Sequence, residues 1–286
     1  MRIELTTPSV GDLPALASAL DGWQPDDVAL QLHAGDLGWH TRLGAAATAA
    51  ALRVWRADGA AAAIGLLDGP GLARLGVAPA LADDAALAAR VADDLHDPDA
   101  GMLPAGDAAV EARLAPALHA ALARLGWVED DPWTPLVRDL AAPVEPHGLA
   151  LEVVDGETSR DGFGAVVAAA FGTRPAPERW TALAASPLAS RATSLLARVD
   201  GAPAAAVTVW SAGEGRQGIL EPMGVDPAFR GRGLGRAIVL AAADALRSQG
   251  ASSAAVATET ANVGGVAAYR SAGFRALPES RDLLRP

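Results

Sequence analysis

Residues 229 to 236 combine small and positively charged residues in a pattern that suits the binding of an anion. The segment reads FRGRGLGR and follows Pro227 by one residue. Glycines let the backbone approach a ligand closely, and arginines donate charge-assisted hydrogen bonds to its oxygens. The glycines are Gly231, Gly233 and Gly235, and the arginines are Arg230, Arg232 and Arg236.

The surrounding sequence predicts a strand, a turn and a helix that together position this segment. Residues 216–225 read as a buried strand, which Pro222 interrupts with a bulge, and residues 235–250 as an amphipathic helix ending at Gly250. The first N–H groups of a helix lack intrahelical partners and lie at the positive end of its dipole, so the glycines can form a cradle for a pyrophosphate. The spacing G-x-G-x-G matches neither the dinucleotide motif nor a P-loop. A strand (252–259), a helix (261–273) and a further strand (274–278) are predicted to follow.

Two motifs in this region resemble those of the GCN5-related N-acetyltransferase (GNAT) superfamily. Arg230, Gly233 and Gly235 fit its Arg/Gln-x-x-Gly-x-Gly/Ala signature, which residues 225–231 precede in the usual V-x-P-x-x-R-G form. Asn262, followed by Tyr269 and then by residues 273–274 (Gly-Phe), fits its later motif. Because both motifs occur with a strand between them, the resemblance is more specific than either motif alone.

The resemblance implies that the anion is the pyrophosphate of acetyl-coenzyme A. In this family two neighbouring strands splay apart, and the pantetheine arm lies in the gap like an added strand. No metal is implied. The residues expected to bind the cofactor are Met223, Gly224, Val225, Arg230, Gly231, Arg232, Gly233, Leu234, Gly235, Arg236 and Asn262.

The resemblance also implies direct attack of an amine on the thioester, with no acyl-enzyme. Tyr269, the only tyrosine, is then expected to protonate the departing thiolate, although it can also be a core residue on a helix face. Glu221 is expected to act as the base, because a partly desolvated carboxylate has a raised pKa. Glu259 is the competing base, and Glu221 can instead contact the bulge or bind a cationic substrate. The backbone N–H near Met223 is expected to polarise the thioester oxygen.

Three patterns occur twice in the same order, which predicts a tandem repeat. Residues 55–67 and 197–209 share a strand, an Asp-Gly turn and a strand. LGVAP at 75–79 matches MGVDP at 223–227, and the helix end before Gly126 matches that before Gly273. The predicted fold is α/β (α+β), with two tandem GNAT-like domains, each a mixed, mostly antiparallel central sheet flanked by helices. The Pro- and Gly-containing stretch 141–150 places the boundary between residues 1–144 and 145–286.

The first half lacks the parts that carry the chemistry in the second. After residues 75–79 come two aspartates and no glycine cradle, and Leu122 occupies the position of Tyr269. We therefore predict a degenerate domain that completes the packing and walls the acceptor pocket. His33 and His40 can line that pocket together with Trp39, or can be surface or capping groups.

Composition excludes several classes of function. The chain has 286 residues and a formal net charge of −11, which argues against a nucleic-acid or membrane partner. It contains neither cysteine nor lysine, which excludes thiolate and Schiff-base enzymes. No cluster of His, Asp and Glu has metal-ligand spacing. The N-terminus lacks an apolar signal core and no stretch is suited to spanning a membrane, so a cytoplasmic protein is expected, as a monomer or homodimer.

The function predicted from the sequence is acetyl transfer from acetyl-CoA to a primary amine of a small molecule. One alternative is a non-catalytic acyl-CoA-binding or interaction module, which would need neither Tyr269 nor Glu221. The other is a protein or peptide acetyltransferase, which would need an open groove.

Overall fold

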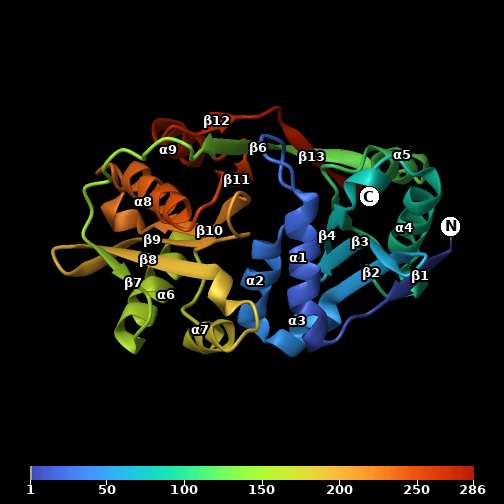
Figure 1. The fold of residues 1–286 in the computed structure, drawn as a ribbon, viewed down its shortest axis with the longest axis horizontal. Coiled ribbons are helices and arrows are strands. Elements are labelled where there is room, and N and C mark those ends of the chain that lie inside the picture. Colours follow the sequence, from blue (N-terminus) through green and yellow to red (C-terminus); the bar gives the residue numbers. More distant parts are fainter. Residues whose placement is uncertain (1) are drawn as a thin grey trace.

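The computed structural model describes residues 2 to 286 and contains two halves with a similar order of strands and helices (Figure 1). The first half comprises β1 (Ile3–Thr6), α1 (Leu13–Trp23), α2 (Ala34–His40), α3 (Ala45–Ala51), β2 (Leu52–Ala57), β3 (Ala60–Leu67), β4 (Leu72–Val77), α4 (Ala85–His96), β5 (Ala108–Glu111), α5 (Pro116–Arg124) and β6 (Val128–Asp139). The second comprises β7 (Leu151–Val153), α6 (Glu157–Phe171), α7 (Pro177–Ala184), β8 (Ala192–Val199), β9 (Ala202–Trp210), β10 (Gln217–Val225), α8 (Leu234–Ser248), β11 (Ser253–Glu259), α9 (Val263–Ser271), β12 (Arg275–Ala276) and β13 (Ser280–Arg285).

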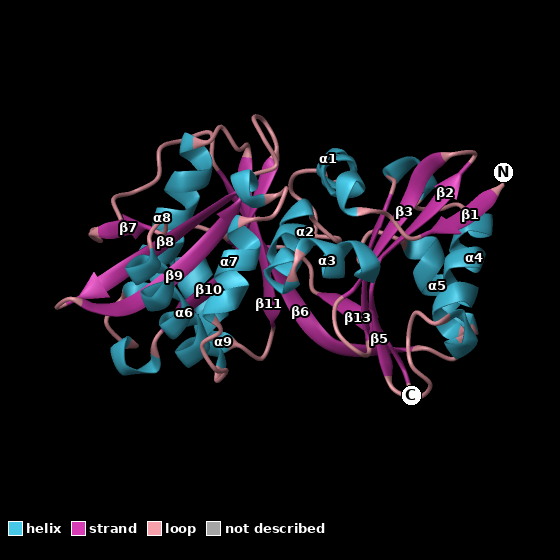
Figure 2. Ribbon diagram, turned by 90° about the horizontal axis from the view of Figure 1, so that it is seen from below, coloured by secondary structure: helices cyan, strands magenta, loops and turns pink. Residues whose placement is uncertain are grey.

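The strands of both halves join in one continuous, mostly antiparallel sheet. Its order is β1-β2-β3-β4-β5-β13-β6-β11-β10-β9-β8-β7, and β12 pairs with β6. Helices flank the sheet in each half, and β6 crosses from one half to the other (Figure 2). The predicted architecture of two α/β domains with mostly antiparallel sheets is therefore confirmed, while the boundary at 144/145 stays a prediction.

At the junction the two halves exchange strands, which the sequence did not predict. Strand β6, which ends the first half, pairs through residues 133–139 with β11, from Ser253↔Asp139 to Glu259↔Trp133. Strand β13, which ends the chain, pairs with β5 through residues 283–285. Each half thus contributes a strand to the sheet of the other, and this holds the two halves in one sheet.

The turns and helix ends agree with the sequence patterns that predicted them. Asp58 and Gly59 have φ of +48° and +90°, and Asp200 and Gly201 have +51° and +81°, as a tight hairpin turn with two left-handed residues requires. Beyond α8, Gly250 has φ of +83°, where a left-handed residue ends a helix most easily. The segment predicted as a strand over 274–278 is shorter, since only residues 275–276 pair.

Helix α2 links the two cores. Added Cβ atoms at Gly35 and Gly38 would lie 2.9 Å and 2.1 Å from Trp210 side-chain atoms, so only glycine allows α2 to approach β9 and β10 this closely. Trp210 is fully buried there and donates from its indole to the carbonyl oxygen of Glu221 at 2.7 Å. A first-half helix is thereby fixed beside the irregular part of β10.

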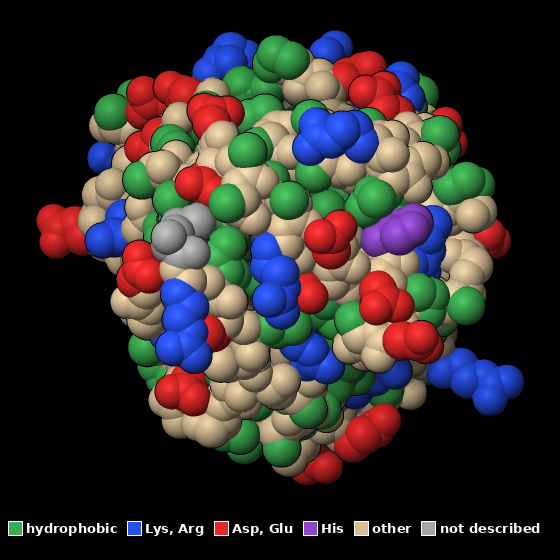
Figure 3. Space-filling model, turned by 90° about the vertical axis from the view of Figure 1, so that its right-hand side faces the viewer, with side chains coloured by type: hydrophobic (Ala, Val, Ile, Leu, Met, Phe, Trp, Pro, Cys, Tyr) green, Lys and Arg blue, Asp and Glu red, His purple; other side chains and the backbone are tan. Residues whose placement is uncertain are grey.

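The surface agrees with an acidic chain of mixed charge. Figure 3 shows the face formed by the first half, on which acidic and basic side chains alternate rather than gather by sign. Among residues 2 to 286, no helix combines the length and apolar character needed to cross a membrane.

Candidate functional site

The main cavity of the described residues lies where β10 and β11 separate. The two strands run parallel and pair only through Gln217–Ile219 and Ser253–Ala255, although β10 continues to Val225 and β11 to Glu259. The cavity in this gap has a volume of about 950 Å³. The pairing of β10 with β9 also shifts register between Leu220 and Met223, which confirms the irregularity predicted at Pro222.

One end of the cavity is formed by the glycine-rich turn and the start of α8. Gly231 and Gly233 have φ of +77° and +79°, in the left-handed region that favours glycine. A Cβ at either position would meet no heavy atom within 4 Å, so the space above the turn is open. Helix α8 begins after Gly233 with no side chain capping its N–H groups. These free donors at the positive end of a 15-residue helix have the chemistry that a phosphate oxygen requires.

The three arginines of the turn differ in their surroundings. Arg230 lines the cavity and donates to the carbonyl oxygens of Val225 (3.3 Å) and Ala170 (3.4 Å). The guanidinium of Arg232 lies 5.4 Å from the centre of the Phe229 ring, and Arg236 donates to the carbonyl oxygen of Ser271 at 2.8 Å. Of the three, Arg230 alone is among the residues that line the cavity.

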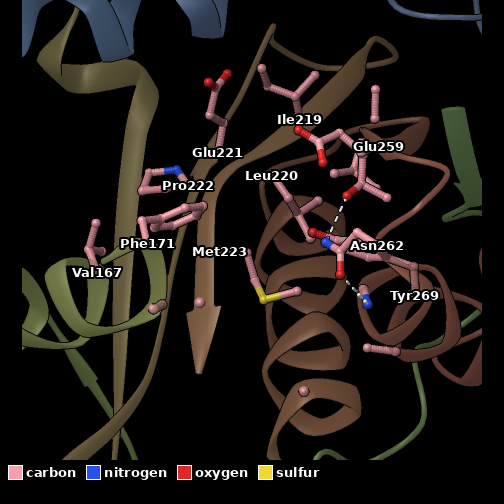
Figure 4. Close-up of a pocket in the computed structure, with 18 of the residues that line it drawn as sticks. Val167, Phe171, Ile219, Leu220, Glu221, Pro222, Met223, Glu259, Asn262 and Tyr269 are labelled. Atoms are coloured by element: carbon pink, nitrogen blue, oxygen red, sulfur yellow. Dashed lines mark hydrogen bonds between the residues drawn. The ribbon is translucent and has the colours of Figure 1, made fainter. Parts of the chain in front are cut away.

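The other residues predicted to bind the cofactor lie around the same cavity. Asn262 caps α9 by accepting from the N–H of Gly265 at 3.1 Å, and donates to the Thr258 hydroxyl at 3.0 Å (Figure 4). An added Cβ at Gly235 would approach Ala268 at 3.3 Å, so glycine allows α8 to pack closely on α9. The remaining lining residues from the predicted set are Met223, Gly224, Val225 and Leu234.

Tyr269 lies on α9 at the wall of the cavity (Figure 4). Its side chain is 5% exposed and its ring centre lies 5.8 Å from that of Phe274. Burial, and secondarily the charge of Glu221, raises the pKa of the phenol above its ordinary value. Tyr269 is therefore both part of the core and protonated at neutral pH, as a proton donor must be.

Glu221 extends from β10 toward the first half (Figure 4). Burial is the main cause that raises the pKa of its carboxyl well above the ordinary value, and the neighbouring Asp36 carboxyl raises it further. Arg74 opposes this shift, while Asp68 adds to it. Glu259, at the end of β11, also lines the cavity, so both predicted bases border the same space.

The charged groups opposite Glu221 come from the first half, and no sequence pattern predicts them. Asp36 on α2, Arg74 on β4 and Glu111 on β5 line the cavity. Arg74 lies 3.0 Å from Asp68, 3.3 Å from Glu111 and 3.6 Å from Asp36. Residues of the first half therefore line the cavity, while their role in walling an acceptor pocket stays a prediction.

Of the aromatic and histidine residues suggested for this wall, only Trp39 borders the cavity. His33 is 1% exposed and caps α2 by accepting from the N–H of Gly35 at 2.9 Å, while its other ring nitrogen lies 3.2 Å from the Gln217 carbonyl oxygen. His40 is buried beside the Thr48 hydroxyl at 2.9 Å. Capping and packing, rather than ligand contact, account for these two histidines.

Comparisons with known proteins agree with this geometry. The sequence model of the acetyltransferase (GNAT) family matches residues 166–274. A mycothiol acetyltransferase of Thermobispora bispora is 32% identical over 190 residues, which are 59% of this chain and 60% of that protein. The aligned part thus spans less than two thirds of that relative.

Solved structures share the fold over nearly the whole chain. A tandem GNAT protein from the clavulanic acid biosynthesis pathway covers 99% of this chain and 98% of its own, with 18% identity and a TM-score of 0.63. A GNAT-family acetyltransferase from Colwellia psychrerythraea covers the same shares, with 17% identity and the same TM-score.

Proposed function

We propose that the chain transfers the acetyl group of acetyl-CoA to a primary amine of a small molecule, because residues 166–274 match the GNAT family model and the whole chain shares the fold of a tandem GNAT protein. The observation that carries the proposal is the gap between β10 and β11 in the second half. Its cavity is lined by the uncapped start of α8 and by Glu221 and Tyr269. The first half contributes residues to one side of the cavity. This supports a small acceptor, because a peptide would need an open groove on that side.

The cofactor fits the donors that this gap offers. Gly231 and Gly233 leave room for the pyrophosphate against the N–H groups at the start of α8. Arg230 is the arginine that borders the cavity and can reach a phosphate oxygen, whereas Arg232 and Arg236 would act from outside it. The backbone of Met223, Gly224 and Val225 would hydrogen-bond the pantetheine arm.

The same geometry supports a direct transfer. Glu221 takes a proton from the acceptor ammonium, and its raised pKa brings its basicity closer to that of the amine. The amine nitrogen then bonds to the thioester carbon and the carbon–sulfur bond breaks. Tyr269 gives its proton to the departing sulfur, and the second proton that the amine nitrogen loses as the amide forms passes to solvent, from which the Tyr269 phenolate is reprotonated. Glu259 is the second candidate for the base, because it borders the same cavity.

Release of free coenzyme A thiol from acetyl-CoA tests this proposal with a panel of small amines. The panel should include the acceptor of the mycothiol acetyltransferase relative and a lysine-containing peptide. We expect amine-dependent release that Glu221→Gln and Tyr269→Phe both reduce. Binding of acetyl-CoA without amine-dependent release of coenzyme A would instead favour a non-catalytic module. Faster release with the peptide than with any small amine would overturn the proposal that the acceptor is a small molecule.

A further inference from the structure

One wall of the cavity carries two arginines that no carboxylate neutralises. Arg42 lies on the short 3-10 helix Thr41–Leu43 that follows α2, and Arg179 lies on α7; both line the cavity. The Arg42 guanidinium lies 4.5 Å from the centre of the Trp39 ring and donates to the Trp39 carbonyl oxygen at 2.9 Å. Within residues 2 to 286, neither arginine has a carboxylate oxygen within 4.0 Å.

Two other arginines that line the cavity, unlike the half-buried Arg42 and the exposed Arg179, have carboxylate partners. Arg74 has three carboxylates within 4.0 Å, and Arg113 lies 2.8 Å from Glu111 and 3.4 Å from Asp282. Asp68, whose charge acts most strongly on Arg42, already pairs with Arg74 at 3.0 Å. The two positive charges of Arg42 and Arg179 are thus available to a ligand.

Burial makes the uncompensated charge of Arg42 costly. It lowers the pKa of the Arg42 guanidinium, and the nearby Arg179 acts in the same direction, while the charges of Asp68 and Glu221 oppose the shift. A buried cation without a partner is unfavourable, and a bound anion would relieve that cost. The planar fork of a guanidinium matches the two oxygens of a carboxylate.

We propose that the acceptor is an amine that also carries a carboxylate, which Arg42 binds with help from Arg179 while the amine lies at Glu221. This inference rests on the proposed function and names the class of its substrate. Trp39 supports it by holding the Arg42 guanidinium against one wall, and Trp39 is itself held by Trp180 on α7, with ring centres 5.6 Å apart. The acceptor would extend across the cavity, with its amine at Glu221 and its carboxylate at Arg42.

Matched pairs of acceptors test the inference, because each pair exchanges the carboxylate for a neutral amide. The comparison is made per concentration of free amine, since the exchange also changes the pKa of the amine. Glycine, β-alanine and 4-aminobutyrate are each compared with the corresponding amide, which covers three separations between amine and carboxylate. We expect kcat/KM to favour the acid over its amide by about 10- to 100-fold for at least one pair, the factor that one charge-assisted hydrogen bond supplies. Arg42→Gln should remove that preference, because it lowers kcat/KM for the acid more than for its amide.

Two further variants separate a specific contact from general damage. Arg42→Lys keeps the charge without the fork and should retain part of the preference. Arg124→Gln removes an exposed arginine on α5, far from the cavity lining, and should change neither rate. Faster transfer to the amides, or an equal loss for acid and amide in Arg42→Gln, would overturn the inference.

Calorimetric binding of the same acids and amides, in the presence of coenzyme A, makes the result independent of turnover. Tighter binding of an acid that depends on Arg42, without transfer to any amine, would support this inference and overturn the proposed function. Transfer to amines with no dependence on a carboxylate would support the function and overturn the inference.

Discussion

The two halves differ in what occupies the gap beside their equivalent strands, β4 in the first half and β10 in the second. In the first half, β4 and β5 pair only through Leu72–Arg74 and Ala109–Glu111, so a gap opens there as well. The chain fills this gap itself: the N–H of Leu32 donates to the carbonyl oxygen of Leu75 at 3.1 Å, and the Gln31 side chain accepts from the N–H of Val77 at 2.9 Å. In the second half, β10 has no strand partner on this side beyond Ile219, and residues 223–225 line the cavity.

The helices that follow these strands also differ, because the N-terminus of the first-half helix is capped and that of the second-half helix is open. Helix α4 begins with Asp84, whose carboxylate accepts from the N–H of Leu87 at 2.8 Å, whereas α8 begins with Gly233 and has no such cap. A carboxylate that already neutralises the positive end of a helix repels a phosphate there. The comparison indicates that a shared fold keeps its gap while side chains decide whether a ligand can enter it.

Removal of the proton-transfer groups should produce the largest difference between the halves. Tyr269→Phe is expected to lower kcat by about 10- to 10⁴-fold with acetyl-CoA affinity nearly unchanged, because it removes only the donated proton. The matched change in the first half, Leu122→Met, preserves a buried apolar side chain and should leave kcat unchanged. Steady-state kinetics and calorimetry supply the two readouts, and an unchanged kcat would remove Tyr269 from the mechanism.

Obstruction of the cradle should abolish cofactor binding without unfolding the protein. Gly233→Val places a β-branched residue at φ of +79° and methyl groups where the phosphate would lie, so we expect acetyl-CoA affinity to fall about 100-fold or more. Gly101→Val is the matched control, since Gly101 has φ of +71° and open space around it in the first half. Equal losses of affinity in both variants would show that backbone strain, rather than the cradle, explains the effect.

A change on the first-half wall should move the pH dependence of the second-half site. The like charge of Asp36 raises the pKa of Glu221, so Asp36→Asn is expected to lower that pKa and to shift the acidic limb of kcat/KM to lower pH. Asparagine can still accept from the N–H of His33, which Asp36 does at 2.6 Å, so α2 keeps its cap. The exposed Asp83→Asn serves as the control. An acidic limb of kcat/KM that does not shift would show that Asp36 does not influence the pKa of the catalytic base.

The parts of the site that adjoin each other in the sequence could be predicted from it. The glycine turn, the irregularity at Pro222 and the Asn262–Tyr269 pair depend on local geometry and spacing, and the structure places them around one cavity. Asp36 and Arg42 could not be predicted. Their position depends on the close packing of α2 against Trp210, which requires glycine on α2 and is not a periodic pattern in the sequence.

The strand exchange and the filled gap were missed for related reasons. Pairing of β13 with β5 joins residues more than 170 positions apart, and an apolar strand pattern does not say which neighbour it selects. Gln31 lies in an irregular segment without a periodic pattern, and the structure shows that it is 2% exposed and bonded to β4.

Substitution of Gln31 should have the smallest effect, and it tests how the gap between β4 and β5 in the first half is filled. Gln31→Ala leaves the N–H of Val77 without its acceptor, so we expect a loss of about 1–3 kcal/mol in the free energy of unfolding. The main-chain bond from Leu32 remains, so no second cofactor site should open. Urea denaturation measures the loss, and an unchanged unfolding midpoint would contradict the role of this side chain.

The most direct test of the contrast between the halves is a calorimetric titration of the intact chain with acetyl-CoA. We expect one site per chain, lost in Gly233→Val and retained in Gln31→Ala. Two sites per chain, or one site that survives Gly233→Val, would contradict the assignment of the cofactor to the gap between β10 and β11.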